Sequence, residues 1–260
     1  DRYYIFFIGY INISIYGGNV LLNDLYMGIE NEIIDKLLYD INNGVYNENE
    51  KMPSENDLAS KYEISRIKVR NIYKKLEKMG YLYSLQGRGR FLKRRTKTIE
   101  LVLSGNESFS KKLKENGFKL ETINICCEKI EYNKHIYNEL RADEDDEIYK
   151  IARLRIVDDE PIAIHISYVS KKIFPNIDRE GEKITSMFDY YEKNGFKNYM
   201  TEKSILEIAY ASVQERIYLK CEDLVPILKL ETNCTDKNSQ KILEYTEIMY
   251  RSDRFKYKIY

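Results

Sequence analysis

The sequence has few of the residues that would point to metal, redox or hydrolytic chemistry. It contains only two histidines and four cysteines, and no two cysteines form a C-x-x-C pair. A structural zinc site or a disulfide framework is therefore not expected, and this use of cysteine fits a reducing cytoplasm. We also find no Ser/His/Asp set and no phosphate-binding loop, so we expect no enzymatic activity, no cofactor and no metal.

No apolar run is long enough to cross a membrane. The most apolar stretch, residues 3–16, is interrupted by Asn12 and Ser14 and falls short of the roughly 20 residues that a spanning helix needs. It lacks the clear basic region and cleavage site of a signal peptide. We therefore expect no membrane partner and treat residues 1–22 as an uncertain N-terminal extension, either a translated upstream region or a real N-terminal strand or arm.

Charge is unevenly distributed, although the formal net charge is zero. Residues 51–95 carry 13 Lys/Arg and 4 Asp/Glu, a net charge of +9, whereas residues 1–50 sum to −6 and residues 96–260 to −3. One short basic block indicates a segment that binds a polyanion, because lysine and arginine neutralise phosphates and release counterions. A solvated charged surface would give the same count, so charge alone leaves both interpretations open.

One predicted helix precedes the basic block, and two more lie within it. Apolar residues at three- and four-residue spacing predict a helix from about Asn23 to Asn42, ended by Asn43-Gly44. Ser54 can cap a second helix, with Asp57 at the capping-box position. A third helix, capped by Ser65, follows after a tight turn, which is the arrangement of a helix-turn-helix.

The third helix would present its early polar residues to the major groove of DNA. Two strand-like runs follow it, joined by Gln86-Gly87-Arg88-Gly89, whose glycines permit a tight turn. A cation at such a tip can enter the minor groove. The pattern predicts a winged helix-turn-helix that binds a double-stranded DNA operator.

The stretch MPSENDLASKYEISRIKVRNIYKKLEKMGYLYSLQGRGRFL resembles the winged helix of the GntR family of bacterial regulators. Its P-S-E, L-A, S-R, V-R and G-x-G-x-F elements stand in the family's order. Lys68 and Arg90 replace the residues that are usual there, which leaves the operator open, and each basic residue could instead make a non-specific phosphate contact. The predicted DNA-binding residues are Glu55, Ser65, Arg66, Lys68, Arg70, Asn71, Arg88, Gly89 and Arg90.

Beyond residues 94–98, which we interpret as a linker, strands alternate with short helices. Hairpin signals such as Asp158-Asp159-Glu160-Pro161 predict a mostly antiparallel sheet and an α+β class. The main strands are expected at Thr122–Ile130, Glu147–Val157, Pro161–Ser170, Met200–Ala211, Ile227–Asn233 and Ile242–Tyr250. Short helices are expected near Lys134–Leu140, Ile184–Asn194 and Val213–Lys220.

Residues 99–260 resemble the UTRA effector-binding domain of the HutC-type GntR subfamily, through stretches such as SFSKKLKENGF and ILEYTEIMYRSDRFKYKI. The resemblance implies a chorismate lyase-like fold behind a winged helix at residues 23–93. It also implies a repressor whose operator binding responds to a small effector. A homodimer is expected, because two-fold protein symmetry matches a pseudo-palindromic operator.

Arg153 and Arg155 are the strongest effector-binding candidates. They are two residues apart on an expected strand, so both point to one face. Two guanidinium groups there repel unless an anion or acids lie between them, which predicts a phosphate or carboxylate clamp, with structural pairing to acids as the alternative. In sugar-phosphate-sensing relatives the matching R-x-R pair binds phosphate.

The resemblance implies further effector contacts, and three of them have structural alternatives. His165 could be a core histidine, Glu244 a surface residue and Tyr250 a core residue. The candidates besides the arginines are Ser108, Phe109, Ser110, His165, Ser186, Phe188, Glu244 and Tyr250. We expect the effector to be a sugar phosphate or another anionic metabolite. A non-sugar carboxylate and, less so, a chorismate lyase-like enzyme are the alternatives.

Overall fold

The structure is a computed structural model of the whole chain. It describes residues 28–93, 113 and 117–253, except for the side chains at 202 and 203, and the backbone alone at 7–8, 11–12, 99–102 and 255–258. The predicted linker and the effector candidates Ser108, Phe109 and Ser110 lie outside these residues. Contacts divide the chain into two units, residues 1–46 with 53–73, and residues 47–52 with 74–260.

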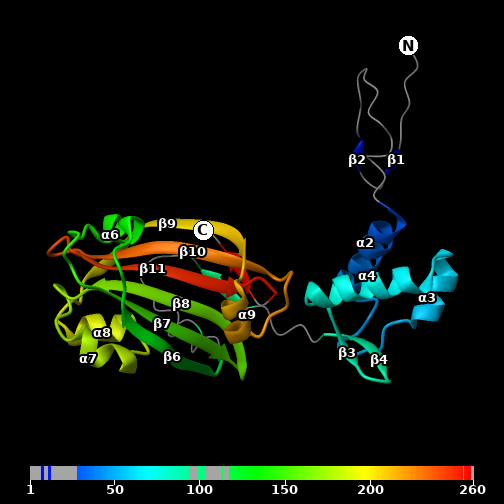
Figure 1. Cartoon of the computed structure of the whole chain (residues 1–260), viewed down its shortest axis with the longest axis horizontal. Helices are drawn as coiled ribbons and strands as arrows, with labels where there is room; N and C mark the ends of the chain where they lie inside the picture. The colour runs from blue at the N-terminus through cyan, green and yellow to red at the C-terminus, as the bar shows by residue number, and fades with distance from the viewer. Residues whose placement is uncertain are drawn as a thin grey trace, which may run out of the picture. The chain divides into compact units, whose positions relative to one another are not determined.

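The first unit is built on helices, drawn in blue and cyan in Figure 1. They are α2 (Ile29–Asn42), α3 (Glu55–Tyr62) and most of α4 (Arg66–Lys78). Helix α2 is described from its N-cap at Gly28 onward, so the predicted start near Asn23 falls outside the described residues. A two-stranded ladder, β1 (Phe7–Ile8) with β2 (Ile11–Asn12), precedes the helices.

The predicted caps of α3 and α4 are confirmed. The Asp57 N–H donates to Ser54 Oγ at 3.2 Å, and the Ser54 N–H donates back to Asp57 Oδ2 at 3.1 Å. Glu63 turns the chain with a φ of +52°, and Ser65 Oγ accepts from the Lys68 N–H at 3.3 Å. These bonds satisfy helix N-terminal donors that would otherwise have no partner within the helix.

In the second unit, the hairpin of β3 (Leu82–Leu85) and β4 (Gly89–Leu92) is the predicted wing. Gly87 and Gly89 have φ angles of +72° and +113°, which residues with a Cβ rarely adopt. Residues 49–52 extend this hairpin, because the Met52 N–H donates to Arg90 O at 2.9 Å. The turn between β3 and β4 is therefore supported by a short segment of hydrogen-bonded strands.

The rest of the second unit is a six-stranded sheet in the order β6-β7-β8-β11-β10-β9, drawn in green to red in Figure 1. Every neighbouring pair is antiparallel, which confirms the predicted sheet and the α+β class. Asp158 and Asp159 have φ angles of +49° and +66° and form the expected turn between β7 and β8. The strands are β6 (Leu120–Lys129), β7 (Ile148–Val157), β8 (Glu160–Ser170), β9 (Tyr199–Tyr210), β10 (Pro226–Asp236) and β11 (Ile242–Arg251).

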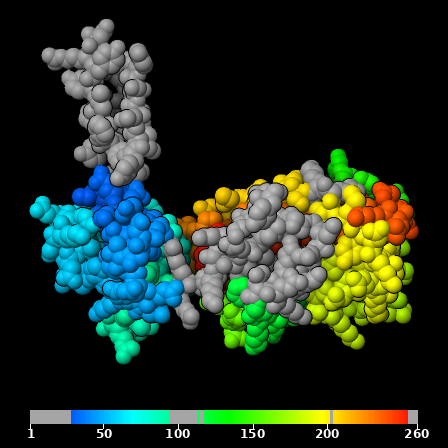
Figure 2. Space-filling model, turned by 180° about the vertical axis from the view of Figure 1, so that it is seen from behind, coloured from blue at the N-terminus to red at the C-terminus, as the bar shows by residue number. Residues whose placement is uncertain are grey.

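Short helices cover both faces of this sheet. On one face α6 (Lys134–Leu140) packs on Tyr168 and Tyr245, and α9 (Val213–Leu219) packs in a cluster with Leu154. On the other face lie α7 (Ile177–Glu180) and α8 (Met187–Lys193), which form one end of the unit (Figures 1 and 2). A parallel ladder joins β5 (Ile99–Val102) to β12 (Phe255–Lys258).

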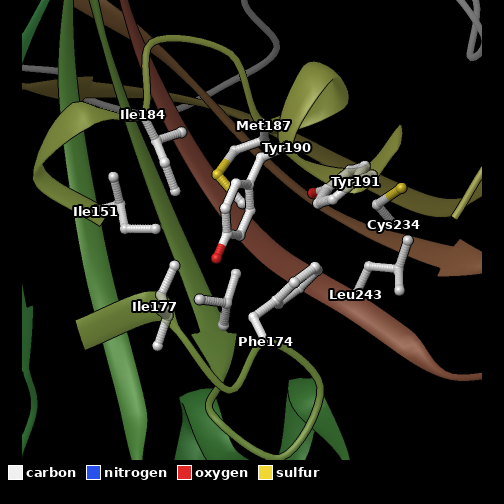
Figure 3. Packing of buried hydrophobic residues seen from close by; sticks show 10 residues of the cluster. Ile151, Phe174, Ile177, Ile184, Met187, Tyr190, Tyr191, Cys234 and Leu243 are labelled. Atoms are coloured by element: carbon white, nitrogen blue, oxygen red, sulfur yellow. The ribbon is translucent and has the colours of Figure 1, made fainter. Parts of the chain in front are cut away.

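The core under α7 and α8 is rich in aromatic residues. Phe174, Tyr190 and Tyr191 pack together with Ile151 in one buried cluster (Figure 3). These buried rings fill the space between the two helices and the sheet.

Helix α7 and the 3-10 turn that follows it at Gly181–Lys183 were not predicted, because they are too short to show a helical period.

Candidate functional site

The outward face of α4 carries the predicted recognition residues. Arg66, Lys68, Arg70 and Asn71 are all exposed, whereas Val69 on the opposite side is fully buried. The inward face of α4 fixes the helix through its apolar residues, so the polar face is left for a partner.

Glu55 of α3 holds Arg70 in place. The Arg70 Nε and Nη2 groups donate to the two Glu55 carboxylate oxygens at 3.3 and 3.2 Å, and this hydrogen bonding raises the pKa of Arg70. Arg66 Nη2 lies 3.9 Å from the same carboxylate. The Glu55 side chain is 16% exposed and that of Arg70 is 50% exposed. Glu55 is thus placed to orient the arginine, since its own charge would repel a phosphate.

The wing divides its predicted contacts between an exposed tip and a paired base. Arg88 and Gly89 are exposed at the turn. The Arg90 Nε group instead donates to Glu77 Oε1 at 3.0 Å, and its side chain is only 17% exposed. Ser84 of β3 donates to the same carboxylate. Arg90 therefore serves to anchor the wing to the end of α4, and Arg88 is the cation at the tip.

A second cluster of predicted residues lies on the sheet face that α8 covers. Arg153 pairs with His165 across β7 and β8, and Arg155 pairs with Ala163, which in turn pairs with Tyr250 of β11. The His165 and Tyr250 rings meet edge to face with centroids 5.7 Å apart. All four polar residues are buried, so the register brings the predicted residues of three strands into one site.

Arg155 ties this site to the segment before α8. Its Nη1 donates to Thr122 Oγ1 at 2.6 Å and to Thr185 O at 2.9 Å. Asn124, which pairs with Arg153 in the strand register, donates to the carbonyls of Gly181 and Ile184 at 2.9 and 3.0 Å. These bonds hold the chain just ahead of Ser186 against the sheet.

Ser186 and Phe188 have different surroundings on α8. Ser186 is the N-cap, and its Oγ accepts from the Asp189 N–H at 3.3 Å. The Phe188 ring packs against Tyr199 and Tyr191, with centroids 5.0 and 5.9 Å away. The structure therefore places Ser186 next to the residue that Arg155 holds, and Phe188 in the aromatic core.

The site concentrates positive charge away from water. Arg153 donates to Ser167, and burial, partly offset by Glu244, lowers the pKa of Arg153. Burial and then repulsion from Arg153 lower the pKa of Arg155 to about 9, so Arg155 stays protonated at pH 7. Burial and the two arginines hold the pKa of His165 well below its usual value, so this ring is neutral. Glu244 is the buried carboxylate that faces the pair among the described residues.

Several buried polar atoms in this site make no hydrogen bond to a described residue. They are Arg153 Nε, Glu244 Oε2 and Thr246 Oγ1. A buried polar atom without a partner costs roughly 1–3 kcal/mol, so such atoms usually have one. Among the described residues, these three atoms are therefore the buried polar groups of this site that lack a hydrogen-bond partner and are not accounted for by another interaction.

Sequence reasoning missed three residues here, namely Ser167, Thr246 and Tyr191. Ser167 and Thr246 are two residues beyond His165 and Glu244, so strand alternation alone would have found them. Tyr191 lies under α8, and burial and the Glu244 carboxylate raise its pKa. It could not have been placed here without the fold.

Comparison with known families identifies the protein family of this chain. The model of the "Bacterial regulatory proteins, gntR family" matches residues 29–92, and the UTRA domain model matches residues 115–256. The chain belongs to the GntR family and carries a UTRA domain. The predicted family is thereby confirmed. Members of the family are DNA-binding transcriptional regulators and not enzymes, as expected.

Curated relatives align over most of their length with this GntR-family chain. The HTH-type transcriptional regulator YurK of Bacillus subtilis is 29% identical over 84% of this chain and 88% of its own. The HTH-type transcriptional repressor NagR of the same species is 27% identical over 88% of this chain and 93% of its own. The agreement spans both the winged helix and the UTRA domain.

Solved structures share the fold. PhnF from Mycobacterium smegmatis gives a TM-score of 0.58 at 17% identity, covering 90% of this chain and 98% of that one. YydK from Bacillus subtilis gives 0.53 at 20% identity, covering 88% and 98%. In the part of this GntR-family chain that the structure describes, no helix has the length and apolarity needed to cross a bilayer.

Replacing Glu55 by Gln should lower operator specificity more than DNA binding as such. The neutral amide cannot hold Arg70 in a bidentate pair, and a misdirected arginine loses its grip on one base. We expect the ratio of specific to non-specific affinity to fall about tenfold. Gel shifts with unlabelled competitor DNA measure this ratio.

Glu32→Gln is the matched control, because Glu32 is an exposed carboxylate of α2 with the same charge. It should leave the ratio unchanged. An unchanged ratio in Glu55→Gln as well would remove the positioning role.

Proposed function

We propose that the chain is a homodimeric, cytoplasmic repressor whose operator binding is controlled by a small anionic effector, most simply a sugar phosphate. The observation that carries the proposal is the pair of buried arginines, Arg153 and Arg155, facing one buried carboxylate. Among the described residues, two guanidinium groups face one carboxylate, and isolating charge from water is expensive. An anion between the guanidinium groups would relieve both the repulsion and the lost hydration.

The polar residues around the clamp favour a sugar as the rest of the effector. Glu244 and Thr246 on β11 offer oxygen acceptors, and Tyr250 offers a hydroxyl. His165 is held neutral, so one ring nitrogen can accept a hydrogen bond while the other donates. Neutral hydroxyl groups match this set better than a second charge does.

Names of relatives support a repressor of sugar metabolism. NagR of Bacillus subtilis is named a transcriptional repressor. A relative from Shigella flexneri, 26% identical over 84% of this chain and 88% of its own, is named for repression of a fructoselysine utilization operon. A non-sugar carboxylate metabolite is the second candidate, since a carboxylate also pairs with guanidinium groups.

Effector control requires that the effector bind two arrangements of the protein with different affinity. Operator DNA must then weaken effector binding by the same factor as the effector weakens DNA binding. Arg155 offers a physical link, because it is part of the clamp and also donates to the carbonyl of Thr185 ahead of α8. An anion that draws the Arg155 guanidinium would act on that segment.

A homodimer is supported by the exposed apolar side chains along β9 and α9. Strand β9 is an edge of the sheet, and an edge strand presents backbone groups that can pair with a second copy. Its Ile208 is 77% exposed, and Ile217 of α9 is 70% exposed. Apolar groups left in water on an edge strand favour an isologous contact.

Replacing Arg153 by Gln should weaken the effector response and leave operator binding intact. We expect a hexose 6-phosphate that releases the native chain from the promoter region beside its own gene to need about 10- to 100-fold higher concentration. Gel-shift titrations compare hexose 6-phosphates, the free hexoses and the matching hexonates.

Lys150→Gln is the control, because Lys150 lies on the same strand, points to the opposite face and pairs with Glu128. It should respond like the native chain. An Arg153→Gln variant with an unchanged response would overturn the clamp, and release by hexonates but not by hexose phosphates would favour the carboxylate alternative.

Replacing Ile208 by Asp should convert a dimer into a monomer. A buried aspartate at a symmetric contact meets its own copy, which adds like-charge repulsion to lost apolar burial. Sedimentation at micromolar concentration measures the mass. Ile123→Asp, on the opposite edge strand β6, is the control and should remain dimeric. A monomeric native chain would contradict the proposal.

A further inference from the structure

Helix α4 carries an isoleucine, Ile67, among the polar residues of its exposed face. Ile67 is 69% exposed and lies between Arg66 and Lys68, which are both exposed. The apolar face of α4 is already supplied by Val69 and Ile72, which are buried. Ile67 is therefore not needed for the packing of the helix.

An exposed isoleucine here also does nothing for helix formation. β-Branched residues lose side-chain freedom in a helix, so Ala, Lys or Gln would suit a solvent position better. The same restriction holds the Ile67 side chain largely in one rotamer, which gives its methyl groups a fixed direction. A rigid apolar group fits recognition of shape better than a flexible one.

The position of Ile67 on the helix places it with the predicted base-reading residues. Residues three and four apart lie on one face, so Ile67 shares its face with Arg70 and Asn71. Three residues correspond to about 4.5 Å along the helix axis, which is close to one base-pair step of about 3.4 Å. Ile67 and Arg70 can therefore meet neighbouring base pairs.

We infer that Ile67 is a specificity-determining residue that contacts the C5-methyl group of a thymine next to the base that Arg70 reads, which is expected to be guanine because arginine pairs with guanine O6 and N7. The thymine methyl is the apolar group that a base pair displays in the major groove, and apolar side chains read it by contact. Burying both groups removes apolar surface from water, which favours thymine over cytosine or uracil at that position. This inference rests on the proposed DNA-binding role of α4.

The test is uracil interference on the promoter region beside the chain's own gene, with the full-length protein. Thymines are replaced at random by uracil, which lacks only the methyl group. Bound and free fragments are then separated and cleaved at uracil. We expect one thymine in each half-site to interfere, with about a fourfold loss of affinity for each missing methyl. Guanine N7 methylation on the same fragments reports the arginine contacts.

Variants separate the methyl contact from DNA binding in general. In Ile67→Ala the uracil signal should disappear while the guanine signal remains. Val45→Ala is the matched control, because Val45 is a 58% exposed β-branched residue outside α4, and it should keep both signals.

Two outcomes overturn the inference. One is native binding that tolerates uracil at every thymine, and the other is an unchanged uracil signal in Ile67→Ala. If the native chain shows the guanine signal without the uracil signal, the proposed function stands and only the role assigned to Ile67 is rejected. A native chain that retains no specific fragment overturns the proposed function itself.

Discussion

The repulsion between the buried guanidinium groups of Arg153 and Arg155 is the constraint on which the effector domain depends. Two positive charges on one face of β7 would push each other toward water, yet both side chains are at most 4% exposed. Among the described residues, this repulsion is opposed by neutral oxygen acceptors from Thr122, Ser167 and the Thr185 carbonyl, and by the Glu244 carboxylate. In the proposed function, an anionic effector adds further negative charge to this site.

In the winged helix, arginines also lie close together, but there they stay exposed and share a carboxylate. There a single carboxylate, Glu55, faces Arg70 closely and Arg66 at a longer distance, and the arginines remain largely exposed. In water such a pair contributes little to stability, but it fixes the direction of a long side chain. In the proposed function, the same residue type thus binds an anion as a buried charge in one unit, and contacts DNA bases as an oriented, exposed side chain in the other.

Local patterns predicted most of the fold, and the family resemblance supplied most of the candidate site. Period-two alternation placed Arg153 with Arg155, and the strand register confirms that His165 and Tyr250 share their face. The capping residues Ser54 and Ser65 were visible because a cap is a contact between near neighbours in the sequence.

Contacts between distant residues could not be predicted in this way. The bond from Arg155 to Thr185 joins positions 30 residues apart, and that from Arg90 to Glu77 joins 13. Arg90 was therefore predicted only as a DNA contact, and its hydrogen bond to the Glu77 carboxylate could not be foreseen from the sequence. Helix α7 has only four residues, so its formation depends on the core around Ile177 and not on a pattern of its own.

The most direct measurement is the urea stability of the native chain and of an Arg153→Met/Arg155→Met variant, in phosphate and in chloride at equal ionic strength. Phosphate strengthens folding generally, so the variant supplies the reference for that effect. If the buried charges await an anion, phosphate should stabilise the native chain more than the variant, and in chloride the variant should be at least as stable as the native chain. Equal stabilisation of both by phosphate, with a less stable variant in chloride, would contradict this account.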